Sequence, residues 1–233
     1  MHEHVVNHLR PLMKKLIILI LSLIILSCNK ESAPSNLISL KLTEFKSYGP
    51  FPQMFSALDW TPLSEKGIWA NTEIKTTGVP QTWTYYNVAQ VWFDSHQFAY
   101  QNYILGNLSE KTFNNLKKSW KIDLEKRKLS NKPIDCFVHV AIGANKDGQL
   151  EYIIDTNNDK DFSDEQIKKP EQMRKGIDLN KVIEESQSIV AEISTNSGIH
   201  KKEIKFLILA DGQGNLIYNF PQIARTNFLE NEI

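Results

Sequence analysis

The chain has 233 residues, of which 27 are basic and 27 acidic, so its formal net charge is zero. Without an excess of positive charge or a basic stripe, the chain has no electrostatic attraction for nucleic acid, and we expect no nucleic-acid partner. Its length is sufficient for one large domain or two small ones, with a sizeable core.

The N-terminus has the pattern of an export signal. Lys14 and Lys15 precede an apolar stretch over residues 16–26, and a small residue, Ser27, stands just before Cys28. A positive start, a short apolar stretch and a small residue at the cleavage site are typical of a secretory signal peptide. The apolar stretch is shorter than the roughly 20 residues that a membrane-spanning helix needs. Residues 1–27 are therefore predicted to be a signal peptide, with residues 1–12 a mis-called start before Met13.

The cleavage site also predicts a lipid anchor. A cysteine directly after a Leu-Ser pair resembles the bacterial lipobox, and this resemblance implies cleavage before Cys28 and acylation of its thiol. More than one acyl chain gives stable membrane anchoring. We expect a protein of the cell envelope, held by lipid at the outer membrane on its periplasmic face or at the cell surface. The alternative is an ordinary cleaved signal followed by a chance cysteine.

The rest of the chain is predicted to be rich in strands. Residues 28–37 are polar and contain Pro and Ser, which predicts a flexible tether that carries the lipid. Residues 38–233 are predicted to be a single β-rich domain. Ser109 can cap a helix in which Phe113, Leu116 and Trp120 recur at helical spacing. Strands are expected from alternation, β-branched and aromatic residues and turn signals at 38–45, 67–75, 83–93, 134–142, 149–155, 188–194, 203–210 and 216–220. The predicted fold is mainly β, an antiparallel β-sandwich-like domain with one or two helices.

One segment has the residue pattern of a metal-binding loop. Residues 155–165 contain five carboxylates, and oxygen-bearing side chains recur at every second residue at its start. This is the 1, 3, 5, 7 spacing with which loops wrap Ca²⁺. The sixth position holds Lys160 instead of glycine, and the alternative interpretation is a solvated acidic turn. The candidate ligands of a structural calcium site are Asp155, Asn157, Asp159, Asp161, Asp164 and Glu165.

The middle of the chain resembles a known family. The segments GNLSEKTFNNLKKSW, KPIDCFVHVAIG and YIIDTNNDKDFSDE resemble the N-terminal β-rich module of TlpA-like lipoproteins, which belong to the thioredoxin family. Members of that family carry a Cys-x-x-Cys redox pair in a second domain, and this sequence has none. The resemblance implies an exported β module without the redox activity. An accessory or truncated relative of these thiol-disulfide oxidoreductases is one alternative for the function.

Other residues are candidates for a glycan-binding or catalytic site. Trp83, Tyr85 and Trp92 could bind a glycan by stacking, although aromatic residues in strands more often fill a core. Cys136 is predicted to be a small buried residue, and the Asp94-Ser-His96 run is not expected to form a catalytic triad. The sequence therefore favours a non-enzymatic binding or structural protein of the envelope. Its partner would be a glycan or another envelope protein, besides the membrane.

Overall fold

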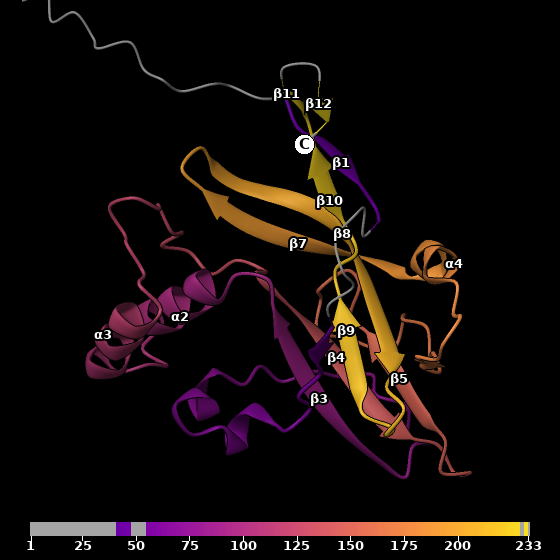
Figure 1. Ribbon diagram of the computed structural model, residues 1–233. Coiled ribbons are helices and arrows are strands. Elements are labelled where there is room, and N and C mark those ends of the chain that lie inside the picture. The colour runs from indigo at the N-terminus through magenta and orange to yellow at the C-terminus, as the bar shows by residue number, and fades with distance from the viewer. Residues whose placement is uncertain (1–40, 48–54, 229–230, 233) are drawn as a thin grey trace, which may run out of the picture. The chain divides into compact units, whose positions relative to one another are not determined.

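The computed structural model describes residues 41–47, 55–228 and 231–232 (Figure 1). The chain divides into two units, residues 1–41 and 42–233, and of the first unit only Lys41 is described. The predicted signal peptide, Cys28 and the tether accordingly lie outside the described residues. Among the residues that are described, no helix combines the length and the apolar character needed to cross a membrane.

Two sheets hold most of the described strand residues. In the first, β3 (Tyr85–Trp92), β4 (Phe137–Ala144) and β5 (Leu150–Ile154) lie side by side and antiparallel (Figure 1). The second is built on the long antiparallel hairpin of β7 (Gln187–Thr195) and β8 (Gly198–Ala210). Three shorter strands join the second sheet. Strand β6 (Glu171–Gln172) pairs in parallel with β8, β9 (Leu216–Asn219) pairs antiparallel with β8, and β2 (Ser56–Ala57) pairs antiparallel with β9.

The described residues also form two short antiparallel strand pairs. Strand β1 (Thr43–Phe45) pairs with β10 (Ile223–Arg225), and β11 (Asn227–Phe228) pairs with β12 (Asn231–Glu232). The observed fold is mixed α/β, with more residues in strands than in helices and with several antiparallel sheets. The coarse prediction of a strand-rich antiparallel fold is thus confirmed.

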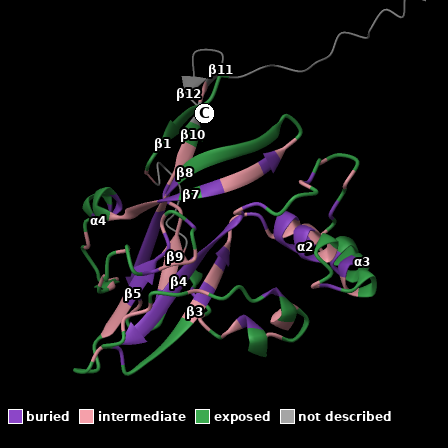
Figure 2. Cartoon of the chain, turned by 180° about the vertical axis from the view of Figure 1, so that it is seen from behind, coloured by how far each residue is buried: buried purple, intermediate pink, exposed green. Residues whose placement is uncertain are grey.

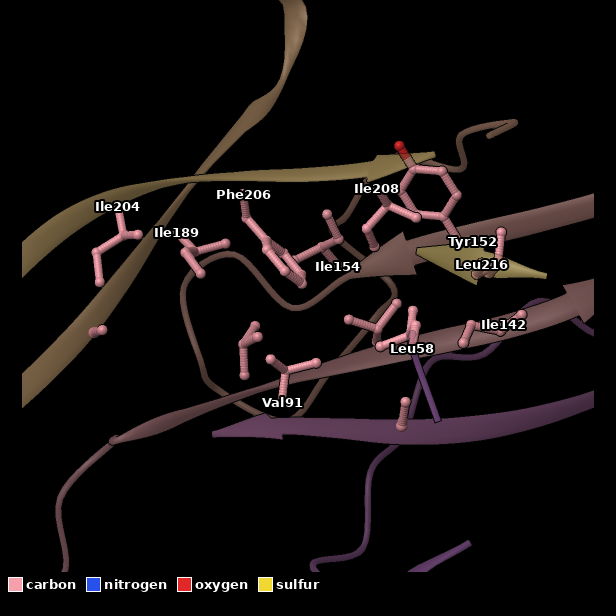
Figure 3. Packing of buried hydrophobic residues seen from close by; sticks show 14 of the residues in the cluster. Leu58, Val91, Ile142, Tyr152, Ile154, Ile189, Ile204, Phe206, Ile208 and Leu216 are labelled. Carbon is pink, nitrogen blue, oxygen red and sulfur yellow. The ribbon is translucent and has the colours of Figure 1, made fainter. Parts of the chain in front are cut away.

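The main core combines residues from both large sheets. Side chains one residue apart on a strand point to opposite faces, so alternate residues of β4 and β8 enter the same cluster. In Figure 3, Phe206 of β8 and Val91 of β3 point toward one another across this core. All eight residues of β4 are buried, which Figure 2 shows as a continuous buried strand. The main contributors from β4 and β8 are Val138, Val140, Ile142, Ile204, Phe206 and Ile208.

The described helices outnumber the one or two that were predicted. Helix α3 (Glu110–Ser119) confirms the predicted helix, since the Ser109 hydroxyl accepts a hydrogen bond from the amide of Thr112 at 3.1 Å. Helices α2 (Ser95–Ile104) and α4 (Leu179–Glu185) were not predicted. Besides Phe98 and Ala99, α2 buries three amide side chains, so its apolar residues alone show no helical periodicity: Gln97, Gln101 and Asn102.

One predicted strand is wrong. Residues 67–72 of the predicted strand 67–75 form the 3₁₀ helix η2 (Gly67–Thr72), which follows the 3₁₀ helix η1 (Leu63–Glu65). Gly67 begins η2 at a φ of 57°, and the Thr72 hydroxyl donates to the Trp69 carbonyl at 2.8 Å. These local bonds compete with pairing to a sheet. The strands predicted at 83–93, 134–142, 149–155, 188–194, 203–210 and 216–220 are confirmed as β3, β4, β5, β7, β8 and β9.

Candidate functional site

The acidic loop, residues 155–165, begins where β5 ends. The Asp155 side chain is fully buried, and its two carboxylate oxygens accept hydrogen bonds from the amides of Asp159 at 3.0 Å and Lys160 at 3.1 Å. Its own amide donates to the carbonyl of His139 on β4 at 3.1 Å. The first predicted ligand position is therefore fixed at the end of the buried sheet.

The next side chains of the loop fold back onto its backbone. Asn157 Oδ1 accepts from the amide of Asp159 at 3.0 Å, and Asp159 Oδ1 accepts from the amide of Asp161 at 2.9 Å. Asp161 Oδ1 in turn accepts from the amide of Ser163 at 3.0 Å. The pKa of the Asp161 carboxyl lies below its ordinary value, and this hydrogen bond from Ser163 is the largest cause. Oxygen atoms of alternate residues thus follow the curve of the loop.

Two carboxylates converge on one point of the loop. The Asn157 amide nitrogen donates to Asp159 Oδ2 at 3.0 Å and to Asp164 Oδ2 at 3.2 Å. A donor between two carboxylates marks a position that favours positive charge. Glu165 is engaged elsewhere, because its Oε1 accepts from the amide and, at 2.7 Å, the hydroxyl of Thr156. The structure therefore brings Asn157, Asp159 and Asp164 together and leaves Glu165 on the Thr156 backbone.

Lys160 takes the conformation that glycine provides at the sixth position of calcium loops. Its φ is 72°, in the left-handed region, which is uncommon for a residue with a side chain. The Lys160 ammonium donates to Asp135 Oδ1 at 3.0 Å and to the Asn158 carbonyl. The positive charge of Lys160 is thus paired with Asp135. Within the part of the chain that the structure describes, no ion pair involves Asp159, Asp161 or Asp164.

Two residues anchor the loop against the body of the protein. Phe162 is 2% exposed and packs with Trp83, Ala141 and Ile153 on the face of the first sheet opposite the main core. Gly78 lies against the loop at a φ of 77°, and a Cβ placed there would approach Asp161 Oδ1 to 2.1 Å. Phe162 stands at the eighth position of the loop sequence, whereas nothing in the sequence marks Gly78.

A buried histidine stands behind the first residue of the loop. His139 is 2% exposed, and its Nδ1 lies 3.7 Å from Asp155 Oδ2. This distance is too long for a hydrogen bond, and Nδ1 has no other hydrogen-bond partner. The alternation along β4 places this histidine on one face of the strand, but it does not reveal its neighbour. Asp155 lies 16 residues further along the chain.

Comparison of the chain with models of protein families, with curated proteins and with solved structures finds no match. Among the residues described, no group of three or more His, Cys, Asp and Glu side chains is gathered as a metal site. In the loop, carboxylate oxygens are instead occupied by backbone and amide donors.

The three aromatic candidates for glycan binding lie in different surroundings. Trp83 is buried, and its indole donates to Glu151 Oε2 at 2.8 Å, whereas the Tyr85 side chain is 54% exposed. Trp92 is partly buried and its ring packs edge-on against that of Trp69, with centroids 4.8 Å apart. The ring of Trp69 also stacks on that of Trp120, a pairing that sequence spacing gave no means to predict.

The remaining candidates have structural surroundings. Cys136 is fully buried, and burial raises the pKa of its thiol well above the ordinary value, so it remains protonated. Asp94 caps helix α2 by accepting from the Gln97 amide at 3.1 Å, and its other oxygen pairs with Arg127. The ring of His96 stacks on Trp120. Asp94 and His96 thus have separate partners, Arg127 and Trp120 respectively.

Proposed function

We propose that this chain is a lipid-anchored protein of the bacterial cell envelope whose antiparallel, sandwich-like module is stabilised by Ca²⁺ in the acidic loop. The anchor is the lipid on Cys28, and the module acts as a binding or structural unit at the outer membrane. The observation that carries the cation is the convergence of Asp159 and Asp164 on the Asn157 side chain. A hard cation at that point would bind oxygen atoms from alternate loop residues.

The charge of the loop supports this proposal. Five carboxylates lie within eleven residues, and Lys160, the only basic residue among these eleven, directs its ammonium to Asp135. Like charges a few ångströms apart repel unless something neutralises them. A divalent cation would remove this repulsion and would join the end of β5 to residues further along the loop. The role is therefore structural, because the loop connects the buried end of β5 to the buried Phe162.

The lipid and the cation are tested separately. Labelled fatty acid should attach to the expressed chain and not to Cys28→Ala. For the cation, the melting temperature of the full chain in detergent is compared in Ca²⁺ and in chelator. At a Ca²⁺ concentration a hundredfold above Kd, binding adds about 2.7 kcal/mol to the free energy of unfolding. Equal melting curves in the two conditions would remove calcium from the proposal and leave the lipid anchor untouched.

A further inference from the structure

The hydrogen bonds behind the acidic loop form a chain that begins at a tryptophan. The Trp92 indole nitrogen donates to Gln90 Oε1 at 2.9 Å. Gln90 faces His139 across the β3–β4 pair, with 3.2 Å between Gln90 Nε2 and His139 Nε2. His139 Nδ1 then faces the Asp155 carboxylate at 3.7 Å. Two hydrogen bonds and this longer approach therefore connect the partly buried Trp92 to the first residue of the loop.

The Trp92 donor determines the orientation of the Gln90 amide and, through it, the protonated nitrogen of His139. An indole N–H is a donor only, so the oxygen of the Gln90 amide must face Trp92 and its NH₂ group must face His139. An NH₂ group donates and does not accept, so His139 Nε2 is the acceptor in a neutral imidazole. The proton of that ring therefore resides on Nδ1, on the side of Asp155.

We infer that His139 is a positioning residue for cation binding, which presents an Nδ1–H to the Asp155 carboxylate and is itself held in that tautomer by Gln90 and Trp92. This inference rests on the proposed function, since it assigns the support of the same site. His139 and Asp155 are both almost wholly buried, so water does not replace this support. Groups that orient a metal-binding carboxylate from behind commonly affect metal affinity as much as ten- to a hundredfold.

The distance between the two side chains gives the inference a physical direction. At 3.7 Å the Nδ1–H and the carboxylate attract each other but do not form a hydrogen bond. A cation in the loop would draw the Asp155 carboxylate into one orientation, and a fixed donor behind it limits the orientations available. His139 thus reduces the ordering that binding requires, in the manner of a preorganised site.

The tautomer is tested first, without any cation. The full chain is labelled with ¹⁵N-histidine, kept in detergent and chelator, and studied by long-range ¹H–¹⁵N correlation. The His139 signals, assigned by their loss in His139→Asn, should show the neutral Nδ1–H form. Gln90→Leu, which removes the Gln90 donor to Nε2, should shift the population toward Nε2–H. An Nε2–H tautomer in the wild type, or no change in Gln90→Leu, would overturn the inference.

Calcium affinity is measured next by calorimetry on the full chain. His139→Leu should bind Ca²⁺ ten- to a hundredfold more weakly, whereas His139→Asn, whose amide N–H stands near the place of Nδ1, should stay within about threefold of the wild type. His200→Asn changes an exposed histidine that contacts Ser197 and should leave affinity unchanged. A role in packing alone would lower the melting temperature of both His139 variants in chelator without separating their affinities.

Two results distinguish this inference from the proposal beneath it. A wild-type chain that binds Ca²⁺ with the same Kd as His139→Leu would overturn the role of His139 and leave the calcium site standing. A wild-type chain that binds no Ca²⁺ would overturn both. Should His139→Leu fail to fold, the affinity of Gln90→Leu decides instead: a weaker Kd supports the inference, and an unchanged Kd overturns it.

Discussion

Two turns of this molecule begin with an aspartate that accepts hydrogen bonds from backbone amides of its own turn, yet only one of these aspartates is buried in the core. Asp211 follows β8, and its Oδ1 accepts from the amides of Gln213 and Asn215, both at 2.8 Å. Asp155 follows β5 and likewise accepts from two amides. Asp211 is partly exposed, whereas Asp155 is fully buried with a histidine behind it.

The difference shows what turn chemistry alone requires. Asp at the start of a turn needs only nearby amides, and the Asp211 turn meets that need at the surface. The acidic loop adds features that no turn needs: a buried carboxylate, four further acids, a close approach by Gly78 and an aromatic anchor. Burying a carboxylate is costly without compensation. A cation that the loop binds would account for these additions together.

The largest expected difference comes from the anchor. Phe162→Ala should lower the free energy of unfolding by about 3–5 kcal/mol, because it leaves a cavity beside Trp83, Ala141 and Ile153. Gln213→Ala, at the exposed position of the other turn, should change it by about 0.5 kcal/mol or less. Chemical denaturation of both variants measures this. Similar small losses would show that the acidic loop is not anchored in the core.

Glycine provides a second matched pair. Gly78 and Gly214 both have positive φ, at 77° and 87°, so alanine costs roughly 1–2 kcal/mol at each from backbone conformation. A Cβ on Gly78 meets the backbone of Ser163 and Phe162, whereas a Cβ on Gly214 meets nothing within 4 Å. Gly78→Ala should therefore cost about 1–3 kcal/mol more than Gly214→Ala. Thermal unfolding of the two variants would contradict the close packing if their losses were equal.

Removal of the two first residues sharpens the comparison further. Asp155→Ala leaves the Lys160 amide without its acceptor and the Asp159 amide with Asn157 Oδ1 alone, at a cost of about 1–3 kcal/mol in chelator. In Asp211→Ala the amides of Gln213 and Asn215 can bond to water instead, and the substitution should cost about 0.5 kcal/mol. Denaturant melts compare the pair. A larger loss for Asp211→Ala would reverse the account of which turn is structural.

The smallest effect concerns acid titration. Asp161 and Asp211 both have a carboxyl pKa below the ordinary 3.8, chiefly through the Ser163 amide and the Asn215 side chain respectively. Since each folded-state pKa is lowered, the stability from each carboxyl is complete above pH 3.8 and is lost as pH falls through the lowered value. Ca²⁺ should lower the pKa of Asp161 further and leave that of Asp211 unchanged. Carboxyl ¹³C titration by NMR would show an equal response if Ca²⁺ did not bind.

How far the sequence predicts this molecule depends on what each buried face is made of. Helix α3 buries Phe113 and Leu116 and was predicted from their spacing, whereas α2, of the same length, buries Gln97 and Gln101 and was not. These glutamines bond to the backbone of Ser130 and Ile134, 33 residues away, which local periodicity cannot show. The longer strands β3, β4, β5, β7, β8 and β9 were predicted because their apolar and β-branched residues and the turns beside them are visible in the local sequence.

The same reason limits prediction of the site. Spacing along the chain identified the oxygen-bearing residues of the acidic loop, since they lie within one short segment. It did not identify His139, Gln90 or Gly78, because these reach the loop only through strand pairing and tertiary packing. The sequence also suggested that Lys160 weakens the site, whereas its backbone takes the left-handed conformation that the loop requires.

Calorimetric titration of the full chain with Ca²⁺ tests the central proposal most directly, with Asp155→Asn and Asp211→Asn as the matched pair. We expect the wild type and Asp211→Asn to bind one ion per chain with the same affinity, and Asp155→Asn to bind it at least tenfold more weakly. Absence of binding by the wild type, or equal affinities for the two variants, would contradict a calcium site at the end of β5.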